Sequence, residues 1–125
     1  MICVNMILYH GTSKENAKSI KRNGFSLEYA GKNWGSTYGK AIYFTNCYET
    51  AKIYAGDFGE ILKVNIKDIN FLKLNKDYSP NNKRDIRKIK FIIMYISLNS
   101  DKNCIINDNL NEYIFFNKFT YTIME

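Results

Sequence analysis

Four residues in four short segments have side chains that could take part in chemistry. They are His10 in "YHGTS" at 9–13, Tyr43 in "GKAIYFT" at 39–45, Tyr54 in "TAKIYA" at 50–55 and Glu112 in "NEYIFFN" at 111–117. Aromatic rings can stack on a flat ligand, and a carboxylate can stabilise positive charge that develops on one. A carboxylate beside apolar residues is costly unless it faces solvent or a polar site. These residues are therefore candidates for a binding or catalytic site.

Each candidate also has a simpler structural interpretation. A histidine beside a glycine is usually a turn residue or a half-buried group with its hydrogen bonds satisfied. Tyr43 in an apolar strand and Tyr54 on an apolar helix face are more often core residues. Glu112 could point outward from a strand that is half exposed. Taken singly, the residues leave both interpretations open.

Length and composition indicate a single domain spanning residues 1–125. Of the 125 residues, 46% are hydrophobic and 15% aromatic, which is enough apolar material for one core. The apolar run "FIIMYISL" at 91–98 is far shorter than the roughly 20 residues that span a bilayer. Because the first residues also lack the features of a signal peptide, we expect a cytoplasmic monomer, with a secreted effector as the alternative.

The charge and the cysteines restrict the partners only loosely. The net charge of +6 favours a polyanionic partner, such as a dinucleotide or a nucleic acid, but also fits mere solubility. The three cysteines, Cys3, Cys47 and Cys104, are widely spaced and accompanied by one histidine. This pattern argues against a disulfide scaffold and against a zinc site, so we expect buried free thiols and no metal.

The first half of the chain is predicted to form two strand–turn–helix units. "MILY" at 6–9 is typical of a buried strand that stops at His10 and Gly11, so that a turn carries His10. A helix should follow within 12–24, where Thr12 and Glu15 have capping-box spacing.

The second unit begins after a glycine-rich loop at 29–39. "AIYF" at 41–44 is its expected strand, and a helix should start at Asn46, with Cys47, Ala51, Tyr54 and Ala55 on one face.

The second half is predicted to be mostly strand. Apolar or alternating patterns favour strands at 60–66, 71–74, 90–98 and 112–116, and the polar run at 75–85 favours an exposed loop. In the first of these, Leu62, Val64 and Ile66 should share one face. The order of elements predicts an α+β fold with mixed or antiparallel β-sheets and two short helices near the N-terminal half.

Taken in order, "YHGTS", "GKAIYFT" and "NEYIFFN" resemble the three signature segments of the PARP-type, diphtheria-toxin-like ADP-ribosyltransferases. In that family a His-Gly pair, a strand tyrosine and a late glutamate correspond here to His10, Tyr43 and Glu112. The resemblance spans nearly the whole chain and implies the ADP-ribosyltransferase fold, with sheets that form an NAD cleft. It also implies a single catalytic domain without the helical regulatory domain of the large eukaryotic enzymes.

The resemblance implies a role for each matching residue, with NAD+ as substrate and no metal. Glu112 would stabilise the positive charge on the ribose as nicotinamide leaves, and Tyr43 and Tyr54 would stack on the nicotinamide ring. Backbone groups of Gly11 would bond the carboxamide, and His10 would hold the other ribose. Lys32, in the loop from 29 to 38, would lie near the pyrophosphate.

The sequence departs from the family pattern in the second helix. Ala51 stands where a small hydroxyl residue bonds the nicotinamide amide, and Thr50 stands where polymerising members often have lysine. Thr12, Thr50 or water would supply the missing bond, or nicotinamide would be held less tightly. These differences favour transfer of single ADP-ribose units over polymer growth, although Glu112 is also compatible with a polymer.

The predicted function is therefore NAD-dependent transfer of ADP-ribose to a macromolecular acceptor, either protein or nucleic acid. Three alternatives remain open from the residues. Water could be the acceptor, which would make the protein an NAD glycohydrolase. The chain could be a non-catalytic module that binds NAD or ADP-ribose, or a small basic protein that binds nucleic acid.

Overall fold

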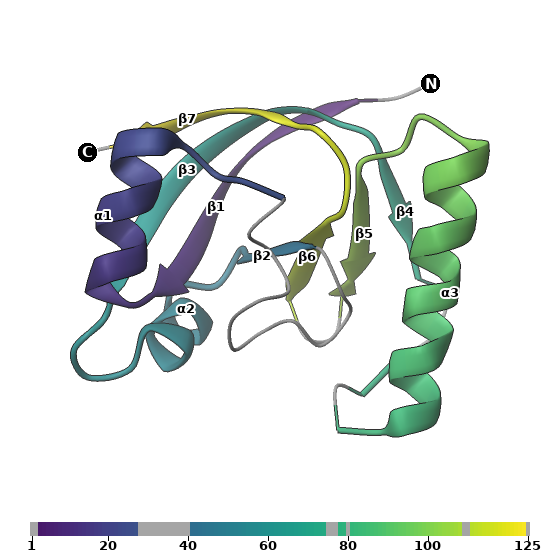
Figure 1. Ribbon diagram of the computed structural model, residues 1–125, viewed down its shortest axis with the longest axis horizontal. Helices are drawn as coiled ribbons and strands as arrows, with labels where there is room; N and C mark the ends of the chain where they lie inside the picture. Colours follow the sequence, from purple (N-terminus) through teal and green to yellow (C-terminus); the bar gives the residue numbers. More distant parts are fainter. Residues whose placement is uncertain (1–2, 28–40, 75–77, 80, 109–110, 125) are drawn as a thin grey trace.

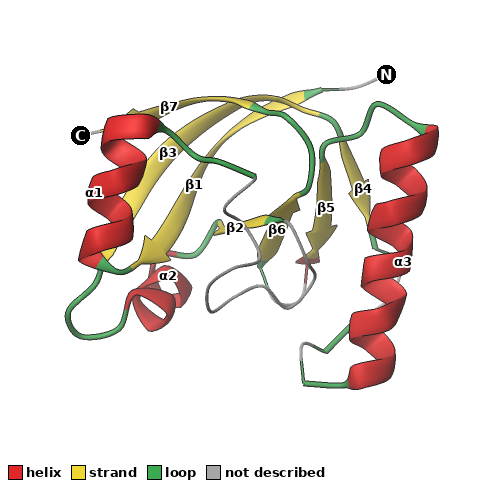
Figure 2. Cartoon of the chain, in the orientation of Figure 1, coloured by secondary structure: helices red, strands yellow, loops and turns green. Residues whose placement is uncertain are grey.

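A computed structural model describes residues 3–27, 41–74, 78–79, 81–108 and 111–124. The predicted α+β class is confirmed (Figures 1 and 2). In chain order the elements are β1 (Val4–Thr12), α1 (Lys14–Asn23), β2 (Ile42–Thr45), α2 (Tyr48–Ala55), β3 (Glu60–Ile69), β4 (Phe71–Lys73), α3 (Lys83–Asn99), β5 (Cys104–Asn107), β6 (Glu112–Phe115) and β7 (Thr120–Met124).

The strands form one sheet in the order β4-β5-β6-β2-β1-β3-β7. Only β4 and β5 are parallel, and the other neighbours are antiparallel. β1 pairs with β3 from Val4 to Thr12, whereas its register with β2 is the single pair Tyr9 and Thr45. The sheet therefore consists of two blocks, β1-β3-β7 and β4-β5-β6-β2, which meet at one residue pair.

Each face of the sheet has its own core, because side chains alternate along every strand. The first core lies under α1 and includes Ala17 of that helix. The second core lies under α3 and includes Ile89 and Ile96 of that helix. On β3, Leu62, Val64 and Ile66 are all buried in the first core, which confirms the predicted alternation.

The first strand and helix differ from the prediction in detail. β1 continues through His10 and Gly11 to Thr12, so His10 lies in a strand and the predicted turn is wrong. Pairing with β3 extends the strand, since Thr12 still has Glu60 as its partner. The N-cap of α1 is Ser13, whose hydroxyl accepts a hydrogen bond from the N–H of Asn16 (3.1 Å), so the Thr12 capping box is also wrong.

The start of α2 was predicted one residue too early. Its N-cap is Cys47, which makes no side-chain capping bond, so Asn46 is not the cap. The hydroxyl of Thr45 instead accepts a hydrogen bond from the N–H of Cys47 (3.1 Å) and directs the chain from β2 into the helix. Of the predicted apolar face, Ala51 is fully buried but Tyr54 is 60% exposed.

The predicted strand at 90–98 is wrong, because these residues belong to α3. Asn82 caps this helix by accepting hydrogen bonds from the N–H groups of Arg84 (2.9 Å) and Asp85 (3.2 Å). The isoleucines favour a strand locally, but Ile89 and Ile96 lie on one helical face and are buried in the second core. Burial of this face on the sheet outweighs the local preference.

Other expectations for the second half were met in part. The strands β5 and β7 were not predicted. Within the polar run at 75–85, Tyr78 is buried and α3 begins at Lys83; residues 75–77 and 80 lie outside the described part. Cys104 is a buried free thiol, as expected, whereas Cys47 is half-buried and Cys3 exposed. No helix within the described residues is both long and apolar enough to cross a membrane.

Candidate active site

Glu112 and Tyr43 lie on the same face of the sheet. Glu112 of β6 pairs with Thr45 of β2, and Tyr43 of β2 pairs with Ile114 of β6. Opposed residues of an antiparallel pair share a face, as do residues two apart in a strand. Glu112 is only 8% exposed, so it does not point outward into bulk solvent. The carboxylate therefore faces the side of the sheet that also carries the ring of Tyr43.

Tyr54 approaches this face from α2. The helix packs on β1 and β3 on the side of Tyr9, whose ring meets that of Tyr48 edge-on at 5.5 Å. Partial burial, and then the negative charge of Glu112, raise the pKa of Tyr54 above its ordinary value. The Tyr54 phenol is therefore neutral at neutral pH and within electrostatic reach of Glu112. Three of the four sequence candidates are thus brought to one side of the sheet.

His10 lies on the other face, but at the same junction between β1 and β2. Its ring packs against Phe25 (5.2 Å) and Phe44 (5.3 Å) in the first core. Nδ1 lies 2.7 Å from the carbonyl oxygen of Tyr43, which can only accept, so Nδ1–H donates. Burial lowers the pKa of His10, and the bond to Tyr43 opposes this only in part. The neutral ring then has Nε2 as a hydrogen-bond acceptor.

Gly11 allows the close approach of α2 to β1. A Cβ at this position would lie 2.9 Å from the backbone nitrogen of Ala55 and closer still to the carbonyl oxygen of Ala51. Beyond Tyr9, β1 is not paired with β2 within the described residues. The backbone N–H and C=O groups on this edge of β1 can therefore bond a ligand. Thr12 ends the same strand and is half-buried.

Thr50 and Ala51, the two positions of α2 that depart from the family pattern, make other contacts. Hydrogen bonds from the side chain and then the backbone of Thr50 lower the pKa of the Cys47 thiol. The Thr50 side chain therefore lies beside this thiol at the start of the helix. Ala51 is fully buried in the contact with β1. Lys32 and the loop from 29 to 38 lie outside the described residues, so their prediction stays open.

Two buried polar residues that were not among the candidates from the sequence flank Glu112. Thr45 (2% exposed) is opposite Glu112 on β2, and Asn107 (1% exposed) is opposite it on β5. The Asn107 side-chain amide donates to the carbonyl oxygen of Tyr78 (3.0 Å), which holds the side chain in place. Polar residues at the ends of "AIYFT" and "CIIN" were the available signal, but only the strand register places them beside the acid.

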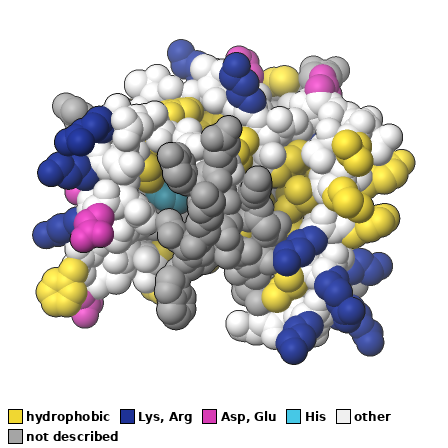
Figure 3. Space-filling model, in the orientation of Figure 1, with side chains coloured by type: hydrophobic (Ala, Val, Ile, Leu, Met, Phe, Trp, Pro, Cys, Tyr) yellow, Lys and Arg dark blue, Asp and Glu magenta, His cyan; other side chains and the backbone are white. Residues whose placement is uncertain are grey.

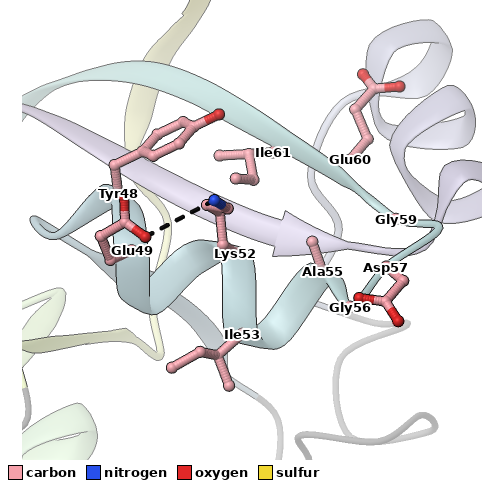
Figure 4. A pocket seen from close by; sticks show the side chains of 10 residues that line it. All are labelled: Tyr48, Glu49, Lys52, Ile53, Ala55, Gly56, Asp57, Gly59, Glu60 and Ile61. Atoms are coloured by element: carbon pink, nitrogen blue, oxygen red, sulfur yellow. Dashed lines mark ion pairs between the residues drawn. The ribbon is translucent and has the colours of Figure 1, made fainter.

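A separate hollow lies between α2 and the start of β3 (Figure 4). It measures about 810 Å³, and an ion pair between Glu49 and Lys52 (3.8 Å) lies along it. None of the four candidate residues contributes to its lining. Because it is an open surface depression that none of the candidates lines, we place the candidate site on the face of Glu112 instead. Within the described residues, no cluster of His, Cys, Asp and Glu could hold a metal ion.

The arrangement has a definite chemical capacity. A buried carboxylate with two phenol rings on its side can stabilise a cationic sugar while a flat base is held by stacking. A neutral histidine acceptor and an open strand edge can bind hydroxyl and amide groups nearby.

Comparison with known families agrees with these features. The family model described as the poly(ADP-ribose) polymerase catalytic domain matches residues 4–88, which is more than half of the chain. The matched part includes His10, Tyr43 and Tyr54, whereas Glu112 lies beyond it. A comparison with curated proteins gives no match.

Proposed function

The chain belongs to the poly(ADP-ribose) polymerase catalytic-domain family, and from this premise we propose that it transfers single ADP-ribose units from NAD+ to a macromolecular acceptor. The family supports ADP-ribosyltransferase activity in general, with NAD+ as the substrate. We propose three further points, which are the number of units transferred, the acceptor and the residues that act.

In the proposed reaction the bond between nicotinamide and ribose breaks, and nicotinamide leaves as a neutral base. Positive charge develops on the sugar carbon and ring oxygen, as in glycoside cleavage. Glu112 stabilises this charge and accepts a hydrogen bond from the ribose 2′-hydroxyl. An acceptor nucleophile then bonds the sugar carbon and gives up its proton to water. The observation that carries this proposal is the burial of Glu112, which is 8% exposed and lies on the same face of the sheet as Tyr43. The charge of Glu112 also acts on the phenol of Tyr54.

The remaining residues bind and orient the substrate. The rings of Tyr43 and Tyr54 enclose the nicotinamide, at about 0.5–1.5 kcal/mol for each aromatic pair. The backbone of Gly11 bonds the carboxamide at the open edge of β1. The neutral His10 ring accepts a hydrogen bond from the other ribose through Nε2, since its Nδ1–H is held by Tyr43.

Transfer of single units is supported by the composition of α2. Thr50 stands in place of the lysine of polymerising members, and Ala51 offers no hydroxyl. The net charge of +6 is compatible with a nucleic-acid acceptor, and a protein acceptor is equally consistent with the sequence.

The test is nicotinamide release from labelled NAD+ by the wild type and by Glu112→Gln. The substitution keeps the shape of the side chain but removes its charge, so we expect release to fall by about 10²- to 10³-fold. Glu49→Gln is the matched control, because Glu49 lies on α2 with its side chain 77% exposed. Release at the background rate by both the wild type and Glu112→Gln would leave only a binding module and refute the proposal, and equal release above background would refute the role of Glu112.

The acceptor is tested with labelled NAD+ and a whole lysate. Label lost on protease digestion identifies a protein acceptor, and label lost on nuclease digestion identifies a nucleic acid. Mass spectrometry of the modified acceptor distinguishes single units from polymer. Free ADP-ribose as the only product would replace the proposal with NAD glycohydrolase activity.

A further inference from the structure

Helix α3 has an outward face that its packing on the sheet does not use. Ile89 is fully buried and Ile96 is 9% exposed, and both hold the helix to the second core. On the outward face a cluster of hydrophobic side chains lies beside a cluster of Lys and Arg, as the right side of Figure 3 shows. The helix is therefore attached by one face and offers a second patterned face to solvent.

The C-terminal half of this outward face is apolar. Its four large side chains are Phe91 (61% exposed), Met94 (54%), Tyr95 (58%) and Leu98 (78%). They recur at intervals of three and four residues, so they form one continuous stripe along the helix. Single exposed apolar residues are common on protein surfaces, but a stripe of this kind marks an interaction site.

The N-terminal half of the same stripe is basic. Arg84, Arg87 and Lys88 continue the spacing toward the start of the helix, and all three are exposed. Over the helix as a whole, five basic residues accompany a single acidic one, Asp85. The outward face thus has the positional pattern of a coiled-coil seam, with charge at one end and apolar side chains at the other.

We propose that this face, the α3 seam, docks an amphipathic helix of a partner protein. The partner helix would carry apolar residues against Phe91–Leu98 and acidic residues against Arg84–Lys88. Helix-on-helix docking uses anchors at intervals of three and four residues, which is the spacing that the seam presents. Charge complementarity fixes the direction of the partner helix, since only one orientation matches acid with base.

A second copy of the chain fits this surface poorly. In an antiparallel pair centred on Phe91, Leu98 of each copy would face Arg84 of the other, so apolar and charged halves would meet. In a parallel pair the apolar halves would meet, but the basic halves would face one another and repel. A membrane fits less well than a helix, because the basic residues occupy the seam itself and would have to enter the apolar layer.

The test uses the full chain and a synthetic helical peptide. The peptide has leucine at the a and d positions of two heptads and glutamate at those positions of a third; a second peptide has lysine in place of glutamate. We expect the glutamate peptide to bind at least about tenfold more tightly than the lysine peptide by fluorescence anisotropy. Arg87→Glu should reduce this preference, whereas Lys67→Glu, an equal charge change on β3, should have a much smaller effect.

The apolar half is tested by Leu98→Ser. Truncation of an interface anchor should weaken peptide binding by about tenfold or more. Ile53→Ser is the matched control, since Ile53 is 79% exposed on α2 and Leu98 is 78% exposed on α3. Circular dichroism and the urea midpoint report whether each variant is folded. NAD+ turnover is measured separately, because the seam does not depend on the proposed reaction.

Three results would overturn the inference. The first is equal binding of both peptides, or of neither. The second is binding to vesicles of phosphatidylserine and phosphatidylcholine that Leu98→Ser abolishes, without a preference for the glutamate peptide. The third is self-association in sedimentation that Leu98→Ser removes, since the seam would then join two copies.

Discussion

Substitution of Gly11 by alanine should impair the candidate site through the position of α2. The added Cβ would lie 2.9 Å from the backbone nitrogen of Ala55, whereas ordinary contact begins at 3.4 Å, so the helix must retreat by more than about 0.5 Å. β1 cannot yield instead, because it is held by β3 along its length. Since Tyr54 lies on α2, its ring would move away from the face of Glu112.

The expected effects on activity and stability differ in size. Overpacking of this kind costs about 1–3 kcal/mol of the free energy of unfolding. A displacement on the order of 1 Å in a catalytic arrangement lowers turnover by about 10²-fold. We therefore expect nicotinamide release from NAD+ to fall roughly tenfold to 100-fold at temperatures where Gly11→Ala is still fully folded.

Gly56→Ala is the control for loss of stability alone. Gly56 caps the same helix with φ +70°, and a Cβ there would have no atom within 4 Å. The variant should lose about 1–2 kcal/mol through backbone strain, which urea unfolding measures, while the helix stays in place. If Gly11→Ala and Gly56→Ala released nicotinamide at the same rate when equally folded, the reasoning would be refuted.

Three further predictions concern single side chains. Tyr54→Ala should raise the KM for NAD+ roughly twofold to tenfold, whereas Tyr95→Ala, with similar exposure on α3, should not; equal KM values would contradict the stacking role. Because burial lowers the pKa of His10 from 6.5, the unfolded chain binds the proton more readily, so the urea midpoint should fall as pH drops below 6.5. His10→Gln should remove that part of the acid sensitivity; an unchanged pH profile would contradict it. Burial raises the pKa of the Cys104 thiol, so iodoacetamide should label Cys3 in the native protein and Cys104 only after unfolding, as mass spectrometry would show.

The parts of the fold that sequence could predict are those with a local pattern. Leu62, Val64 and Ile66 alternate strictly with exposed or half-exposed neighbours, and this alternation predicted the buried face of β3. α3 was mistaken for a strand because its isoleucines and aromatics favour strands. The helical spacing of Ile89 and Ile96 was present, but the deciding factor was the sheet on which they pack.

Short motifs in the sequence propose the residues of the candidate site but not their arrangement. Short motifs identified Tyr43, Tyr54 and Glu112, and the structure places all three on one side of the sheet. Their shared face follows from the register of β6 against β2, which joins residues far apart in the chain. The same register brings Thr45 and Asn107 beside the acid, and nothing local in the sequence reports it.

The single register pair between β1 and β2 has a mechanical consequence. The chain passes from one block of the sheet to the other between β1 and β2, β2 and β3, β3 and β4, and β6 and β7. Within the described residues, the strand register at this line is the single pair Tyr9 and Thr45, and His10 adds a side-chain hydrogen bond to the carbonyl oxygen of Tyr43 and a ring contact with Phe44. A change of angle between the two blocks at this line would break few backbone hydrogen bonds and would leave the strand pairing within each block intact.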